Sequence, residues 1–254
     1  MRSYRFNLAM DVKFMKNTAS IAIFIHIYYT DTWHEISKYL LNFHNPAILV
    51  NISYDNPKRH EISRKIFEYF PNAIVIQSAN QGKDIGAKLA LMDIYLKMEL
   101  KTDYLILLHD KKSPQALDGD AWRKKLFKIV QKESIPIILN RFNSKNIGMV
   151  AAIDQIVNST DQNNVIINKY KEYISPLLAA YRLNQKDETF VGGTMFWVRS
   201  SIFEVFFNEF SPLSIRTTLE KGNVTDNKEP RQTHAWERIL CWIVTSKGLK
   251  ISGV

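Results

Sequence analysis

The sequence of 254 residues has one cysteine and no long apolar run, and both absences narrow the class of protein. Cys241 has no partner for an intramolecular disulfide, and its place within "ILCWIV" predicts a small buried residue. The longest apolar runs, such as "SIAIFIHIYY", fall well short of the roughly 20 residues that span a bilayer. The first residues show no signal-peptide pattern, so we expect a cytoplasmic protein.

Low-complexity tracts and repeats at solenoid spacing are also absent. Hydrophobic residues make up 46% of the chain and charged residues 23%, which is typical of an ordinary globular protein. We therefore expect a short N-terminal extension over residues 1–19 and a single domain over residues 20–254.

Acidic residues are in deficit, with 25 aspartates and glutamates against 34 lysines and arginines. The net charge of +9 predicts attraction to an anionic partner. Nucleic acid, an acidic membrane surface and phosphorylated small molecules all fit that charge. Several lysines follow predicted strands instead of lining one helical face, which places part of the charge at the ends of a sheet.

The first half of the domain alternates apolar strands with amphipathic helices. Strands are expected at 21–29, 47–54, 73–77 and 104–108, each separated from the next by one helix. Thr32 and Glu35 match a capping box at the start of the first of these helices. This alternation predicts a Rossmann-type α/β fold with a mostly parallel sheet, in which ligands bind at the carboxyl ends of the strands.

The alternation loosens further along the chain. Helices are expected over 121–130, 163–183 and 234–248, and short strands over 147–153 and 249–254. Between them, "ETFVGGTMFWVRSSIFEVFF" predicts one strand that is interrupted by two glycines and followed by a helix.

The segment "NQGKDIG", residues 80–86, lies between the third strand and the third helix. It lacks the first glycine and the Ser or Thr of a phosphate-binding loop, so it is not a Walker motif. One interpretation makes Asp84 a helix N-cap and Gly82 a turn residue. The other makes the polar side chains of the segment part of a binding site.

The segment "HDKKS", residues 109–113, directly follows the apolar strand "YLILL" and is mostly charged or polar. It is either a solvated turn or a functional loop. In the functional interpretation, Lys111, Lys112 and Ser113 donate hydrogen bonds to phosphate oxygens. Asp110 would then hold a divalent metal that bridges a diphosphate.

Two later segments carry the remaining candidates. The glycines of "FVGGTMFWVR" indicate a bulge or the close approach of a ligand or another backbone. In "THAWERIL", His234 and Glu237 share one helical face, and Arg238 follows them. Glu237 is a candidate general base and Arg238 a diphosphate clamp, while helix-end electrostatics is the structural alternative. No HExxH pattern is present, so a zinc site is not expected.

In their joint order these segments resemble the rhamnan synthesis F family of bacterial polysaccharide glycosyltransferases. The resemblance extends from about residue 20 over most of the chain. The matching segments are "IAIFIHIYYTDTWHEISKYL", "NQGKDIGAKL", "YLILLHDKKS", "WRKKL", "IGMVAA", "GGTMFWVR" and "THAWERIL".

The resemblance implies a GT-A-like fold, with a nucleotide-sugar-binding half over 20–115 and an acceptor and catalytic half over 116–254. The donor would be a nucleotide-diphosphate sugar, carrying rhamnose or another deoxyhexose. The acceptor would be a surface polysaccharide or a lipid-pyrophosphate-linked glycan, which is compatible with peripheral attachment to the inner membrane.

The resemblance also distributes roles among the residues. It puts the base on Glu237, with His234 beside it. Where many GT-A enzymes carry an Asp-x-Asp metal motif, Asp110 is followed by two lysines, so a role for Mn²⁺ or Mg²⁺ stays open. The residues implied in donor binding are Asn80, Lys83, Asp84, His109, Lys111, Lys112, Ser113, Gly192, Gly193, Thr194 and Arg238.

Three alternatives stay open. Asp110 and Lys112 match half of a D-x-K nuclease site, for which Asp84 is the obvious second acid. A non-catalytic nucleic-acid-binding module also fits a basic chain, although we expect no nucleic-acid partner. The missing Asp-x-Asp motif leaves an inactive transferase as the third.

Overall fold

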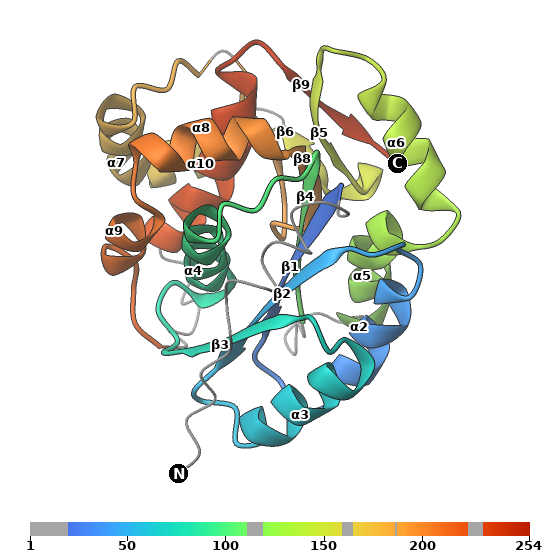
Figure 1. Ribbon diagram of the computed structural model, residues 1–254. Coiled ribbons are helices and arrows are strands. Elements are labelled where there is room, and N and C mark those ends of the chain that lie inside the picture. The colour runs from blue at the N-terminus through green and yellow to red at the C-terminus, as the bar shows by residue number, and fades with distance from the viewer. Residues whose placement is uncertain (1–19, 111–118, 159–164, 186, 223–230) are drawn as a thin grey trace.

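The computed structural model describes residues 20–110, 119–158, 165–185, 187–222 and 231–254. A seven-stranded sheet crosses the molecule with the strand order β3-β2-β1-β4-β8-β5-β9, and helices cover both of its faces (Figure 1). A small second sheet pairs β6 with β7. The strands are β1 (Ile21–Ile27), β2 (Ala47–Ser53), β3 (Ile74–Ser78), β4 (Tyr104–His109), β5 (Ile147–Ala151), β6 (Ile156–Asn158), β7 (Thr189–Val191), β8 (Phe196–Arg199) and β9 (Lys250–Gly253).

The predicted α/β fold is confirmed, and so is the alternation of the first half. Strands β1 to β4 pair in parallel, with β1 between β2 and β4. Strand β8 enters between β4 and β5 and is antiparallel to both. The order of the strands reverses between β1 and β4, and in open α/β sheets this is where the carboxyl ends of the strands leave a crevice for a ligand.

The helices form two layers. On one face of the sheet, α4, α8 and α10 bury their apolar sides in one core, and on the other face α2, α3, α5 and α6 bury theirs in a second core. The helices are α2 (Trp33–Leu40), α3 (Arg59–Tyr69), α4 (Lys83–Lys97), α5 (Gly119–Leu126), α6 (Ser134–Phe142), α7 (Val165–Ala180), α8 (Ser200–Glu209), α9 (Pro212–Thr217) and α10 (Gln232–Thr245), with short 3₁₀ turns η1 (Phe127–Val130) and η2 (Ile153–Gln155).

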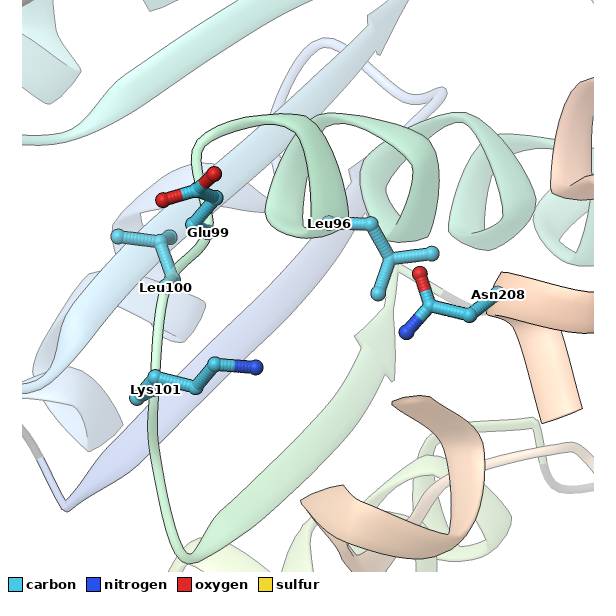
Figure 2. Close-up of a pocket in the computed structure, with 5 residues that line it drawn as sticks. All are labelled: Leu96, Glu99, Leu100, Lys101 and Asn208. Atoms are coloured by element: carbon cyan, nitrogen blue, oxygen red, sulfur yellow. The ribbon is translucent and has the colours of Figure 1, made fainter. Parts of the chain in front are cut away.

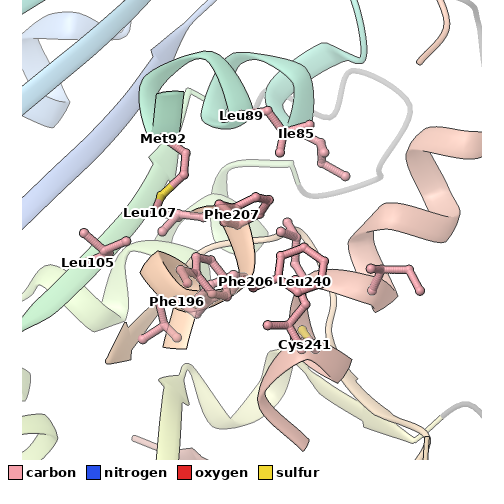
Figure 3. Packing of buried hydrophobic residues seen from close by; sticks show 14 of the residues in the cluster. Ile85, Leu89, Met92, Leu105, Leu107, Phe196, Phe206, Phe207, Leu240 and Cys241 are labelled. Atoms are coloured by element: carbon pink, nitrogen blue, oxygen red, sulfur yellow. The ribbon is translucent and has the colours of Figure 1, made fainter. Parts of the chain in front are cut away.

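The first core joins segments that are far apart in the sequence. Figure 3 shows Leu89 of α4, Leu107 of β4 and Phe207 of α8 packed close to Leu240 of α10. Cys241 is fully buried in the same core, as predicted, and burial raises the pKa of its thiol to about 12. Within the described residues, no helix is long and apolar enough to cross a bilayer.

Two local predictions were wrong. The stretch expected to be one interrupted strand forms two strands in different sheets, because Gly193 and Thr194 both adopt positive φ values and turn the chain between β7 and β8. The capping box at α2 is absent. Thr32 is the N-cap residue, but its side chain makes no cap hydrogen bond and instead donates to Asp110, 78 residues away.

The segment "NQGKDIG" turns sharply from β3 into α4, and its glycines are needed for that turn. Gly82 has φ +73°, and its amide donates to the carbonyl of Glu220. A Cβ on Gly86 would lie 1.7 Å from the carbonyl oxygen of Gln81. This turn is therefore fixed by close backbone packing, which confirms Gly82 as a turn residue. The interpretation of Asp84 as the N-cap was wrong, because Gly82 takes that position and Asp84 lies in the first turn of α4.

We expect Gly86→Ala to lower the free energy of unfolding by about 2 kcal/mol or more, because the methyl group overlaps with backbone that has little room to move. The matched control is Gly192→Ala. There, a Cβ meets nothing closer than 3.7 Å, so a change below about 0.5 kcal/mol is expected. Urea unfolding of both variants checks the prediction, and equal stability of the two would contradict it.

Candidate functional site

Three polar side chains stand in one row near the carboxyl ends of adjacent strands. His109 ends β4, His26 is its register partner on β1, and Asn51 is the partner of His26 on β2. Register partners project from the same face of a sheet, so the row faces the α4 side. All three are buried in a sheet that is otherwise apolar at this depth.

The row is held by hydrogen bonds that continue to β3. The Nδ1 atom of His26 lies 3.1 Å from Oδ1 of Asn51, and the Asn51 amide donates to Oγ of Ser78. Burial lowers the pKa of His26 to about 4, so this imidazole is neutral at physiological pH. Arg216 of α9 closes the end of the row by donating to the carbonyls of Ala79 and Gly86.

The ammonium of Lys88 is the centre of a second cluster, directly beside the row. It lies 2.9 Å from Oδ2 of Asp84, 3.1 Å from Nδ1 of His109, and 2.8 Å from the carbonyl oxygen of Thr194. The Thr194 hydroxyl lies 2.6 Å from the same ammonium and donates to Asp84. One buried cation thus joins the start of α4, the end of β4 and the turn before β8.

Burial opposes the ionisation of Asp84, but the neighbouring Lys88 ammonium, His109 and the Thr194 hydroxyl outweigh it. Together they hold the pKa of Asp84 well below its ordinary value. These contacts all use Oδ2 of Asp84. The side chain is 23% exposed, so a charged carboxylate lies partly open to solvent at the carboxyl edge of the sheet.

The turn before β8 also holds Glu237. The amide of Gly193 donates to Oε1 of Glu237 at 2.7 Å, while Thr194, the next residue, bonds to Asp84. Thr194 has φ +52°, a rare conformation for a β-branched residue, and such strain clusters at functional sites. Two predicted site residues from distant segments, Asp84 and Glu237, are therefore linked through consecutive residues of one turn.

The other two residues predicted from "THAWERIL", His234 and Arg238, pack against aromatic rings. The guanidinium of Arg238 lies 4.4 Å from the ring centre of Tyr170 and 4.2 Å from that of Phe190, and it donates to the carbonyl of His234. Arg238 is 6% exposed, and this sandwich fits a structural role better than a diphosphate clamp. The His234 ring contacts Tyr170 edge-on.

The carboxylate of Asp110 fastens β4 to the loop after β1. It accepts hydrogen bonds from the amides of Tyr28 and Tyr29 and from the Thr32 hydroxyl. Asp110 is 2% exposed, and burial raises its pKa to about 7 against the opposing effect of these donors. Both carboxylate oxygens of Asp110 accept hydrogen bonds, and these bonds link β4 to the loop after β1 at the point where the strand order reverses.

The remaining predicted residues fall in three places. Asn80 lies in the turn before α4, where the backbone of residues 80–82 pairs with that of residues 220–222, and Lys83 is the first residue of α4. Gly192 adjoins Gly193 and donates its amide to Gln155. Lys111, Lys112 and Ser113 lie outside the described residues. Within the described part of the chain, no three His, Cys, Asp or Glu side chains gather as a metal site would require.

Sequence reasoning missed His26, Asn51 and Lys88. A signal was present for the first two: each is a single polar residue near the end of an apolar strand, in "IFIHI" and "ILVNIS". Lys88 gave a weaker signal, as a charge within the apolar helical run "GAKLALM". Its significance depends on burial at 3% exposure, which the helical pattern alone did not reveal.

A surface hollow of about 470 Å³ lies at the opposite edge of the sheet. Figure 2 shows Leu96, Glu99 and Leu100 at the end of α4, with Lys101 and Asn208 beside them. These residues precede the amino end of β4 or come from the end of α8. The hollow therefore belongs to the amino edge, away from the polar row and the Lys88 cluster.

Comparison with known proteins shows the family to which this chain belongs. The sequence model described as "Rhamnan synthesis protein F" matches residues 6–249. Two curated relatives, each described as "Uncharacterized protein WxcX" and found in two strains of Xanthomonas campestris pv. campestris, are 25% identical to this chain over 243 residues. The match covers 92% of this chain and 33% of each relative, so the chain spans about a third of their length.

We expect Lys88→Met to lower the free energy of unfolding by about 2–4 kcal/mol near neutral pH, because it leaves the largely buried Asp84 carboxylate without its cation. Lys97→Met on the same helix is the control. Lys97 also pairs with an aspartate four residues away but is 65% exposed, so its loss is expected to cost less than about 1 kcal/mol.

The pH dependence should also differ between wild type and Lys88→Met. In the wild type, the depressed pKa of Asp84 stabilises the fold above the unfolded-state pKa, and this contribution is lost as pH falls towards the folded-state pKa. Lys88→Met removes the largest of the interactions that offset burial and so raises the Asp84 pKa, and the stability deficit should therefore shrink as pH falls. A deficit that stays constant from pH 7 to pH 4 in chemical denaturation would contradict this assignment.

Proposed function

Because the chain belongs to the rhamnan synthesis protein F family, we propose that it is a glycosyltransferase that uses a nucleotide-diphosphate sugar as its donor. The family ties the chain to polysaccharide synthesis. The proposed acceptor is a growing polysaccharide or a lipid-pyrophosphate-linked glycan, and rhamnose or another deoxyhexose is the proposed sugar. The fold is compatible with this assignment, because the polar residues gather at the carboxyl edge, where α/β sheets bind nucleotides.

The observation that carries the proposal is the link between Asp84 and Glu237 through the turn at Gly193 and Thr194. Glycosyl transfer needs two separate functions close together. One is a site for the donor, and the other is a carboxylate that can accept the proton of an acceptor hydroxyl. The turn holds one charged carboxylate on the α4 side and a second carboxylate on α10, both partly exposed.

In the proposed reaction, Glu237 accepts the proton of the acceptor hydroxyl as the hydroxyl oxygen bonds to the anomeric carbon of the donor. The bond between that carbon and the phosphate oxygen breaks, and the nucleoside diphosphate leaves with the bonding electrons. Gly193 holds Oε1 of Glu237 in position through its amide. The proposed role of the Asp84 carboxylate is to accept a hydrogen bond from a hydroxyl of the donor.

The leaving diphosphate needs positive charge. Lys111 and Lys112, which follow the end of β4 directly in the sequence, are the proposed source of this positive charge. Asp110, the residue before them, is the proposed positioning residue, because its carboxylate accepts hydrogen bonds from Tyr28, Tyr29 and Thr32. Charge neutralisation by lysines instead of a metal ion is accordingly the proposed arrangement.

The nuclease alternative gains no support from the described residues. In a nuclease, Asp110 would have to bind a metal together with Asp84. Both oxygens of Asp110 instead accept hydrogen bonds from Tyr28, Tyr29 and Thr32. Asp84 meanwhile bonds to Lys88 on the α4 side.

The donor is best tested by thermal shift with uridine, thymidine and guanosine diphosphates and their sugars, each with and without Mn²⁺. We expect stabilisation by one nucleotide and little change on addition of Mn²⁺. A strong requirement for Mn²⁺ would reject lysine neutralisation while leaving the transferase proposal intact. Absence of any nucleotide effect, together with stabilisation by DNA, would reject the transferase.

The base is tested with Glu237→Gln. Because the amide cannot accept the acceptor proton, release of nucleoside diphosphate from the donor identified above should fall by about 10²- to 10⁴-fold. Nucleotide affinity should stay within about twofold of wild type. Glu172→Gln, at an exposed glutamate of α7, is the control and should keep full activity. Unchanged turnover in Glu237→Gln would exclude the proposed role.

A further inference from the structure

The positive charge of the chain is concentrated in one short stretch. Residues 123–145 contain seven basic side chains and one acidic side chain, Glu133, so this stretch carries six of the nine net positive charges of the chain. It runs from the end of α5 through η1 and α6 to the start of β5, over the face of the sheet that α2 and α3 also cover (Figure 1). We call residues 123–145 the basic flank.

Most of these cations are not neutralised by neighbours. Arg123 pairs with Glu35 at 3.1 Å and Lys125 with Asp154 at 3.6 Å. The other five are exposed and form no ion pair within the described part of the chain: Lys124, Lys128, Lys132, Arg141 and Lys145. The flank therefore presents a net positive surface.

Apolar side chains are exposed on the same flank. Ile137 and Leu139 of α6 are 48% and 38% exposed, and Pro136 beside them is also exposed. Outside the flank, Ile153 of η2 is 55% exposed and adjoins Asp154, the partner of Lys125. Meanwhile Ile138 and Phe142 anchor the inner side of α6 in the core. The helix thus has an apolar inner face and, unusually for a surface helix, exposed aliphatic residues among the cations.

We propose that the basic flank docks the protein on an anionic lipid surface, with its lysines and arginines at the headgroups and the aliphatic side chains of α6 at the acyl boundary. Basic residues around exposed aliphatic residues are the combination that interfacial helices use. Nucleic-acid surfaces more often add exposed aromatic rings for stacking. Here both aromatic residues described in the flank, Phe127 and Phe142, are buried.

The flank runs from the carboxyl edge of the sheet towards its amino edge. Arg123, at its start, pairs with Glu35 of α2, and the N-cap residue of α2, Thr32, donates to Asp110 at the end of β4. Phe142, near its end, stacks on Tyr104 at the amino end of β4. The docking surface does not depend on the proposed function.

The test is cosedimentation of the full chain with vesicles of phosphatidylcholine alone or mixed with phosphatidylglycerol, at low and physiological salt. Wild type should bind the mixed vesicles, less so as salt rises, and should not bind phosphatidylcholine alone. Lys128→Glu with Lys132→Glu should weaken binding by about thirtyfold or more, since each lysine near an anionic surface contributes about fivefold.

Lys171→Glu with Lys247→Glu is the matched control. It changes the net charge equally, at exposed lysines on α7 and after α10, and should bind like wild type. Ile137→Ser with Leu139→Ser should weaken binding without changing its salt dependence. If both charge-reversal variants lost vesicle binding equally, net charge alone would explain the binding, and the proposal would be overturned. So would absence of vesicle binding by wild type, or binding of DNA through the same lysines without vesicle binding.

Discussion

The buried ammonium of Lys88 is the interaction on which the site depends. It contacts all three segments that meet there: Asp84 of α4, His109 of β4 and Thr194 before β8. His109 and Thr194 are 21 and 106 residues away from Lys88 along the chain. A single cation with several donors can hold such segments together because each partner is an acceptor in a water-poor environment.

A buried ion pair is weak evidence for stability, since removing two charges from water costs about as much as their attraction returns. Here the main effect of the ion pair is to fix the positions of the side chains around it. Lys88 keeps Asp84 charged and holds Thr194 in a left-handed conformation that a threonine rarely adopts. Thr194 in turn follows Gly193, whose amide holds Glu237. Strain and desolvation are thus concentrated at one point, where they fix the relative positions of two carboxylates.

The carboxyl edge is closed differently on its two sides. On the α4 side, the Lys88 cluster joins the sheet to α4 and the turn before β8. On the α2 side, the Asp110 carboxylate joins β4 to the loop after β1 and to Thr32. Adjacent residues at the end of β4, His109 and Asp110, therefore serve opposite faces of the sheet, because successive side chains of a strand alternate in direction. The basic flank lies on the Asp110 side.

The sequence alone determined the α/β class, the first four strands and the helices between them, because local hydrophobic periodicity specifies such elements. It also indicated Asp84, His109 and Glu237 as polar residues at strand ends and a helix start. Only the tertiary structure decided that β7 and β8 belong to different sheets, that Thr32 serves Asp110 instead of its own helix, and that Lys88 is buried. Each of these depends on partners dozens of residues away, and no local pattern encodes which distant segments will meet.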